Sequence, residues 1–174
     1  MNTRTKTISA AAAVLILGTA VYAQDKYALT SPSGIALSDF RGYEDWAVVS
    51  SARTDEVLKV IVANPTMIEA YKTGVPGNGQ PFPDGSRIAK LQWKPKKSTE
   101  APFDVNVQDT FSQAFAIEKD SKRFPNSGGW GYALFNYEAA SDKFAADPSP
   151  SDCGHACHVA VKAKDYIFHP YQKR

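Results

Sequence analysis

The chain has 174 residues, with 20 Lys and Arg against 18 Asp and Glu, and 43% of its residues are hydrophobic. This length fits one domain that can bury a substantial core. The nearly even charge balance gives no support for a nucleic-acid partner or for binding to an anionic membrane.

The first 23 residues have the three parts of a secretory signal peptide. Arg4 and Lys6 form a basic start, residues 8–21 are apolar, and small residues precede a cleavage site after Ala23. The apolar run is shorter than the roughly 20 residues that span a bilayer. We therefore expect a periplasmic protein with no membrane span after cleavage. Because the leader carries two of the 20 basic residues, the mature chain is expected to be neutral.

The next elements are a hairpin and a helix. Residues 45–53 and 56–64 are rich in β-branched side chains and lie either side of a short polar turn. This pattern predicts two antiparallel strands. A helix is expected to follow, with Asn64 as N-cap, Pro65 at its first position and Gly74 beyond its end.

Three further strands are expected, at residues 86–93, 111–118 and 130–138. The basic stretch 94–102 is expected to be a solvated loop. Residues 111–118 alternate in period two, so Phe111 and Phe115 should share one side of their strand. Together these elements predict an α+β fold in a single domain, predominantly an antiparallel β-sheet with a few short helices.

The segment SDCGHACHVA, residues 151–160, holds the only two cysteines of the chain. Unpaired thiols are unusual outside the cytoplasm, so Cys153 and Cys157 should be bonded to each other, to a metal or to a cofactor. A disulfide would close a very small loop. A zinc site would crowd these cysteines with His155 and His158 and would lack a second, separated ligand pair. A haem-attachment site of the Cys-x-x-Cys-His type would carry one extra spacer residue, so all three interpretations stay open.

Three fragments, in chain order, resemble the cytochrome P-460 family: FPDGSRIAK, EKDSKRFPNSGGWGYALF and CHVAVKAKDYIFHPY. The likeness begins near Tyr43, which divides the mature chain into an N-terminal segment, 24–42, and a haem domain, 43–174. The resemblance implies an exported mono-haem c-type protein with a mainly antiparallel β fold. It also implies a five-coordinate iron with an open distal face, a redox partner protein and a homodimer.

The same resemblance implies which residues hold the cofactor, haem c. Cys153 and Cys157 match the two thioether donors, and His158 matches the iron ligand. We call the haem-attachment segment, residues 153–158, the hook. The family usually has two spacer residues between the cysteines of this hook, and this chain has three.

Three other side chains able to bind iron are expected to have different roles. His155 is expected to be a spacer that faces solvent, and His169 a surface or packing residue. Met67 lies on the apolar face of the expected helix and should belong to the core. A second axial ligand is therefore not identified, which disfavours a plain electron carrier.

Two further positions carry the family's chemistry. Lys90 matches a lysine that bonds to a meso carbon of the porphyrin, although strand alternation alone also permits it to point into water. Phe115 stands where hydroxylamine-oxidising members have an acidic proton acceptor, and a phenyl ring cannot take protons. Phe111 is expected to add to an apolar distal pocket, and Glu118 to point to the opposite side of the strand.

Three functions stay open on this basis. The first is an enzyme that oxidises hydroxylamine or nitric oxide at a Lys-crosslinked haem. The second is a protein that binds nitric oxide or carbon monoxide, similar to cytochrome c-prime-beta. The third is a simple electron-transfer cytochrome. We expect a crosslinked haem that handles nitrogen oxides but oxidises hydroxylamine poorly, because apolar surroundings favour a neutral Lys90 while Phe115 supplies no base.

Overall fold

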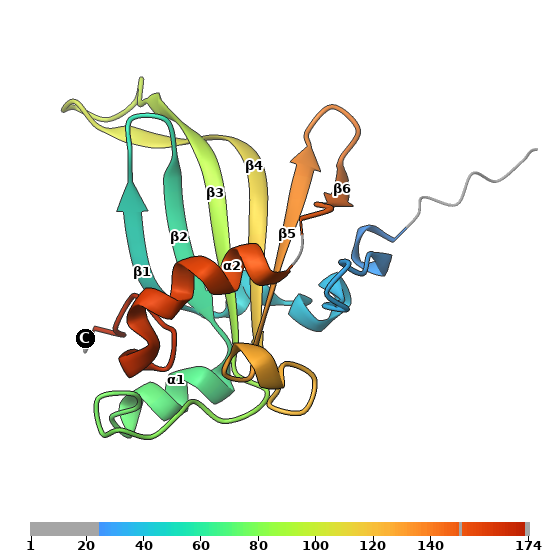
Figure 1. Cartoon of the computed structure of the whole chain (residues 1–174). Helices are drawn as coiled ribbons and strands as arrows, with labels where there is room; N and C mark the ends of the chain where they lie inside the picture. The colour runs from blue at the N-terminus through green and yellow to red at the C-terminus, as the bar shows by residue number, and fades with distance from the viewer. Residues whose placement is uncertain (1–24, 150, 173–174) are drawn as a thin grey trace, which may run out of the picture.

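The computed structural model describes residues 25–149 and 151–172, and its centre is one six-stranded sheet (Figure 1). Neighbouring strands are antiparallel and follow the order of the chain. The strands are β1 (Ala47–Arg53), β2 (Leu58–Ala63), β3 (Arg87–Lys97), β4 (Asn106–Lys119), β5 (Trp130–Glu138) and β6 (Lys143–Ala146). The predicted α+β fold in one domain is confirmed. The expected signal peptide, 1–23, lies outside the described residues.

Two α-helices accompany the sheet, α1 (Pro65–Lys72) and α2 (Ser151–His158). The predicted cap of α1 is confirmed, because the Asn64 side-chain oxygen accepts a hydrogen bond from the Met67 backbone N–H at 3.2 Å. Figure 1 shows α2 crossing one face of the sheet and α1 lying at one end of it. The 3₁₀ helices are η1 (Lys26–Ala28), η2 (Leu37–Phe40), η3 (Tyr43–Asp45), η4 (Pro125–Ser127) and η5 (Val159–Lys164). Within the described ranges, every helix is too short or too polar to cross a bilayer.

The predicted hairpin of β1 and β2 is confirmed, as is β5. The structure differs from the prediction in three places, the first being that the strand expected at 111–118 begins at Asn106 as β4. The expected solvated loop at 94–102 is wrong in its first part, since β3 continues to Lys97. Register shifts around Trp93 and Pro95 let the strand continue past a residue that has no N–H to donate. The four-residue strand β6 was not predicted, and it pairs with the end of β5.

Different parts of the chain cover the two faces of the sheet. The N-terminal face is covered by residues 25–46, which contribute Tyr27, Ile35, Leu37 and Phe40 to a buried cluster. The opposite face, called here the α2 face, packs against α1, α2 and the residues that follow α2. Because both faces are covered, β3 is apolar on both sides, with Ile88 on one and Leu91 on the other.

Phe111 lies on the N-terminal face, so the prediction that it shares a side with Phe115 is wrong. The pairing of β3 with β4 shifts between Gln92 and Trp93, which turns the strand over locally. The Phe111 ring packs 5.3 Å from the ring of Trp93, and it also contacts Tyr137 and Phe144. Phe111 therefore belongs to the aromatic cluster on the N-terminal face of the sheet and does not line the cavity on the α2 face.

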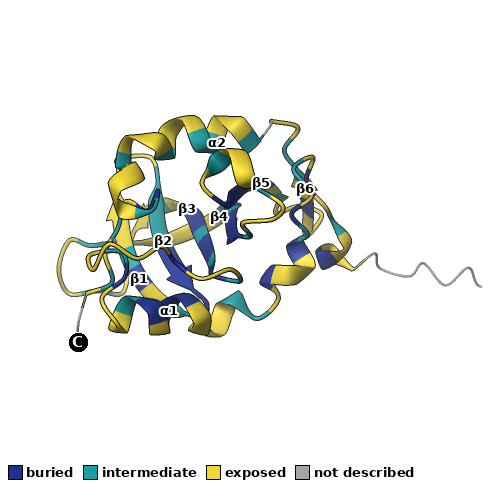
Figure 2. Ribbon diagram, turned by 60° about the horizontal axis from the view of Figure 1, so that its bottom comes forward, coloured by how far each residue is buried: buried dark blue, intermediate teal, exposed yellow. Residues whose placement is uncertain are grey.

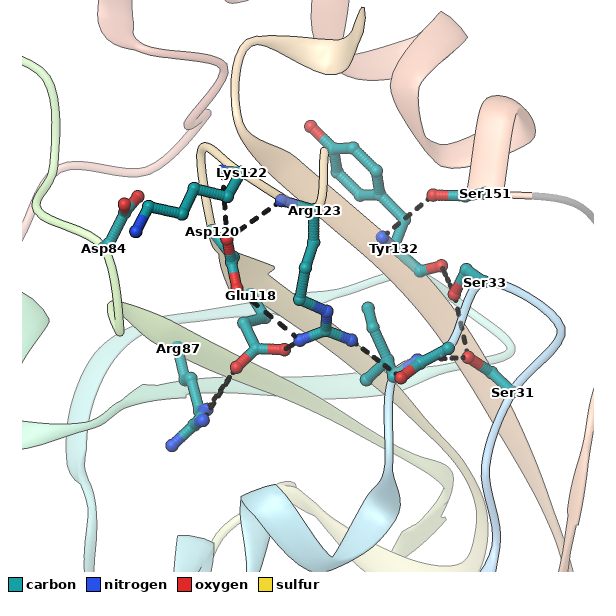
Figure 3. Close-up of polar contacts among 12 residues, drawn as sticks. Ser31, Ser33, Asp84, Arg87, Glu118, Asp120, Lys122, Arg123, Tyr132 and Ser151 are labelled. Atoms are coloured by element: carbon teal, nitrogen blue, oxygen red, sulfur yellow. Dashed lines mark hydrogen bonds and ion pairs between the residues drawn. The ribbon is translucent and has the colours of Figure 1, made fainter. Parts of the chain in front are cut away.

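Glu118 points to the N-terminal face, as expected, and forms a buried ion network there (Figure 3). Its carboxylate accepts hydrogen bonds from Arg87 at 2.7 Å and from Arg123 at 2.8 Å. Arg123 also donates to the carbonyl of Gly34 at 2.7 Å. The network thus ties the N-terminal segment to the end of β4.

Candidate functional site

A cavity of about 220 Å³ lies between the α2 face of the sheet and the chain after α2. Lys90 of β3, Cys157 and His158 of α2 all line it, so the structure brings together three of the residues predicted for the site. The rest of the lining is mainly aliphatic, with Val49, Ile61, Ile88, Ile117 and Ile167. Among the described lining residues none is Asp or Glu.

His158 is held in a form suited to binding a metal. Its Nδ1 lies 2.6 Å from the carbonyl oxygen of Tyr166. Because a carbonyl only accepts, Nδ1 carries the proton and Nε2 keeps its lone pair. Burial lowers the pKa of His158, although the Tyr166 hydrogen bond works in the opposite direction. The rings of Tyr132 and Phe168 flank the imidazole, each with its centroid 4.9 Å away.

The two cysteines are free and exposed, so the disulfide interpretation is not realised in the structure. Both lie on α2, one helical turn apart. Cys157 lines the cavity, whereas Cys153 is not part of its lining. A zinc site gains no support either, because no three His, Cys, Asp or Glu side chains gather as possible ligands within residues 25–149 and 151–172.

The helix α2, which carries the two cysteines, contacts β5 at Gly154 and at Ser151. A Cβ added at Gly154 would overlap the side chain of Tyr132, so glycine allows α2 to approach β5 closely. The Ser151 hydroxyl at the start of α2 accepts a hydrogen bond from the Tyr132 N–H at 3.1 Å (Figure 3). These contacts fix the position of the hook helix against the sheet.

The prediction that His155 faces solvent is wrong. His155 lies three residues before His158, so the two histidines share the inward side of α2. Its ring packs near Tyr132 and Tyr166, with the Tyr166 centroid 5.4 Å away. The His155 Nδ1 and the Tyr132 hydroxyl are both buried without a hydrogen-bond partner among the described residues. Buried polar atoms normally have partners, so this side of α2 is suited to an additional group.

Lys90 points into the cavity rather than into open water. Its Nζ lies 3.7 Å from the centroid of the Phe115 ring, which stands directly opposite on β4. Burial lowers the pKa of Lys90, and the nearby charge of Lys59 lowers it further. The neutral amine is therefore more accessible at this position than in solution. Phe115 covers Lys90 with an apolar ring, but it is not among the residues that line the cavity.

The sequence did not identify four contributions to the site, which come from Tyr71, Tyr166, Phe168 and His169. His169 lines the cavity, and its Nδ1 lies 3.3 Å from the Ser50 hydroxyl. Its own carbonyl accepts a hydrogen bond from Tyr71 at 2.9 Å, so a residue expected to have a surface or packing role lies at the cavity. The aromatic run directly after the hook was the available signal. Met67, fully buried in the core, is as predicted.

The residues present fit a haem held from α2. An imidazole with a free Nε2 faces an apolar cavity, and a cysteine thiol lies beside it. No residue of α2 is fully buried, although the helix crosses an apolar sheet face (Figure 2). A helix in this position normally buries an apolar stripe. The missing stripe is what a flat apolar group between α2 and the sheet would supply.

Comparison with known proteins agrees with this geometry. The family model described as Cytochrome P460 matches residues 40–169, which is most of the chain. No curated protein matches the chain. The matched range contains every residue that lines the cavity, and members of this family bind haem c. The chain therefore belongs to the cytochrome P460 family of c-type haem proteins.

Proposed function

We propose that Cys153 and Cys157 attach the haem through thioethers and that His158 binds its iron through Nε2. The observation that carries this proposal is the half-buried His158, whose Nδ1 is hydrogen-bonded to Tyr166 and whose Nε2 is free beside Cys157. The position of Cys157 in the cavity lining supports it as the stronger of the two attachment points. Haem iron with one open coordination position binds small nitrogen oxides and exchanges electrons with them.

The protein's proposed role is to handle small nitrogen oxides at a haem crosslinked to Lys90. Formation of the crosslink would remove one N–H from Lys90 and one C–H from a meso carbon as the C–N bond forms. The two electrons and two protons would pass to an oxidant of the peroxide class, giving two waters. The lowered pKa of Lys90 supports this role, because only the neutral amine has a lone pair for the new bond.

Hydroxylamine oxidation should be slow in this protein, because the reaction requires proton removal. Phe115 covers Lys90 with a phenyl ring, and the described lining of the cavity holds no carboxylate. Burial raises the pKa of Tyr71, and its hydroxyl already donates to His169. The pocket thus supports ligand capture better than repeated proton abstraction.

A second function, the binding of nitric oxide or carbon monoxide without turnover, is favoured by the same apolar surroundings. Comparison of the two activities on one preparation separates the candidates. Gas binding together with undetectable oxidation of nitric oxide and hydroxylamine would favour the binding protein.

The cellular setting is also a proposal. The pattern of residues 1–23 supports export to the periplasm. There the protein would exchange electrons with a redox partner and form a homodimer.

Intact mass after periplasmic expression tests the attachment. The mass should exceed that of the chain cleaved after Ala23 by one haem. A haem-free chain that contains only a Cys153–Cys157 disulfide would contradict the proposal. Peptide mapping should then find the Lys90 peptide joined to the haem peptide.

A further inference from the structure

The chain turns back sharply after α2, at Asp165 and Tyr166. Both residues have left-handed backbone conformations, with φ of 48° and 63°. Residues other than glycine adopt this conformation at a cost in free energy, and they keep it where surrounding contacts determine it. Contacts with the surrounding chain are therefore needed to hold this turn in place.

A buried ion pair holds the first residue of the turn. The Lys119 ammonium group, at the end of β4, donates to both carboxylate oxygens of Asp165, at 2.8 and 3.0 Å. Both side chains are almost enclosed, with 6% and 11% exposed. The Asp165 carboxylate also accepts from the Phe82 backbone N–H at 2.7 Å. The turn is thereby joined to the sheet and to the loop before β3.

The same lysine also holds the surface on which Tyr166 packs. Lys119 donates a third hydrogen bond, at 2.8 Å, to the carbonyl of Gly128. A Cβ at Gly128 would overlap the Tyr166 ring, so the ring lies directly on the glycine backbone. We call Lys119, Gly128 and Asp165 the Lys119 clamp. It fixes the backbone of Tyr166 through Asp165 and the ring of Tyr166 through Gly128.

The Tyr166 carbonyl is the group that accepts the Nδ1 hydrogen bond of His158. A partner at this position selects the tautomer of a metal-binding histidine, orients its ring and raises its basicity. We propose that Lys119 and Asp165 are positioning residues that set the strength of the bond between His158 and the haem iron. This inference rests on the proposed role of His158 as iron ligand.

The N-terminal face provides a matched control. Glu118 is the neighbour of Lys119 in β4, and its side chain is similarly buried, with 4% exposed, although its arginine partners are more exposed than Asp165. Its partners are Arg87 and Arg123, on the opposite side of the sheet from Tyr166. Glu118→Gln therefore weakens an ion network at the adjacent position of β4 and leaves the contacts of the Lys119 clamp unchanged.

The test is the iron–histidine stretching band in the resonance Raman spectrum of the ferrous holoprotein, identified by its shift on ¹⁵N-histidine labelling. Asp165→Asn should move this band to lower frequency and raise the reduction potential, because a weaker hydrogen bond leaves His158 less basic. Glu118→Gln should leave both unchanged. The double variant Lys119→Met/Asp165→Leu replaces both charges with apolar side chains, so it avoids an unpaired buried charge and should shift the band in the same direction.

The outcomes separate this inference from the proposed function. A wild-type band that is unchanged in Asp165→Asn and in the double variant overturns the inference and leaves His158 as the ligand. Equal shifts in Asp165→Asn and Glu118→Gln also overturn it, because general loosening then explains both. A wild-type spectrum with no histidine-sensitive band, or one retained in His158→Gly, overturns the ligand assignment and the inference together.

Discussion

Each of the two faces of the sheet has its own apolar cluster, but buried polar groups differ between them in their hydrogen-bond partners. On the N-terminal face, the buried carboxylate of Glu118 has arginine partners for both of its oxygens. On the α2 face, the Tyr132 hydroxyl, the His155 Nδ1 and the Trp130 Nε1 are buried without hydrogen-bond partners among the residues that the structure describes. The same face carries the lowered pKa values of Lys90 and His158. The difference shows that one face is built for stability and the other to receive a group.

Loss of the hook thiol in the cavity should have the largest effect. Cys157→Ala is expected to lose most of the covalent haem, because Cys157 lines the cavity and is the stronger proposed attachment point. Cys153→Ala should retain haem through the remaining thioether, since Cys153 lies outside the lining. Intact mass and the alkaline pyridine spectrum measure both. If the two variants lose haem equally, the proposed asymmetry of the hook is wrong.

A cavity in the N-terminal face should reduce stability and spare the site. Phe135 is fully buried there, so Phe135→Ala should lower the free energy of unfolding by about 3–5 kcal/mol. Denaturant unfolding of the holoprotein measures the loss. The absorption spectrum of the folded fraction should match the wild type, and a changed spectrum would show that the two faces are coupled.

Addition of a proton acceptor to the α2 face should raise the rate of hydroxylamine oxidation. Phe115→Glu should raise hydroxylamine turnover at neutral pH by roughly 100-fold, the lower range for general-base catalysis. Phe115→Gln, of the same size but unable to take a proton, is the control. Because a carboxylate beside Lys90 would also raise the pKa of that lysine, the crosslink is checked by peptide mapping in each variant. A wild type that is already fast, with Phe115→Glu inert, would mean that another residue accepts the proton.

Removal of Lys90 should alter the spectrum more than the stability. Lys90→Leu is expected to restore an ordinary haem c spectrum by removing the crosslink. Stability should fall by less than about 1.5 kcal/mol, because an apolar side chain of similar size suits this half-buried site. Optical spectra and denaturant unfolding measure the two effects. An unchanged spectrum would show that the wild type has no crosslink at Lys90.

The smallest effect concerns a surface contact at the rim of the sheet. Hydrogen bonds from the Ser121 hydroxyl and N–H lower the pKa of Asp84 below its ordinary value of 3.8. A lowered folded-state pKa adds stability above about pH 4 that is lost as the pH falls through the folded-state value. Asp84→Asn should remove this contribution, by less than about 1 kcal/mol at pH 7 and by nothing in strong acid. Unfolding curves at several pH values check the sign, and a larger loss in acid would contradict it.

The sequence was sufficient for five of the six strands, for the α1 cap and for Lys90, Cys157 and His158 at the cavity, because each has a local pattern. Phe111 could not be placed from its alternation, because a register shift around Trp93 changes which face of the sheet the side chains before it point to. His155 was misplaced because its position between the cysteines was read as a spacer, while helical spacing puts it on the same side of α2 as His158. The partner of His158 is a backbone carbonyl, and residue identity gives no signal for such a group.

The glycine in the hook helix has a consequence for how such helices are recognised. Removal of one spacer residue would turn the rest of the helix by about 100° around its axis. The third spacer therefore determines the direction in which His158 points. A pattern scan that requires two residues between the cysteines would overlook this chain. A scan that allows a third, and asks for a glycine directly after the first cysteine, would retrieve it.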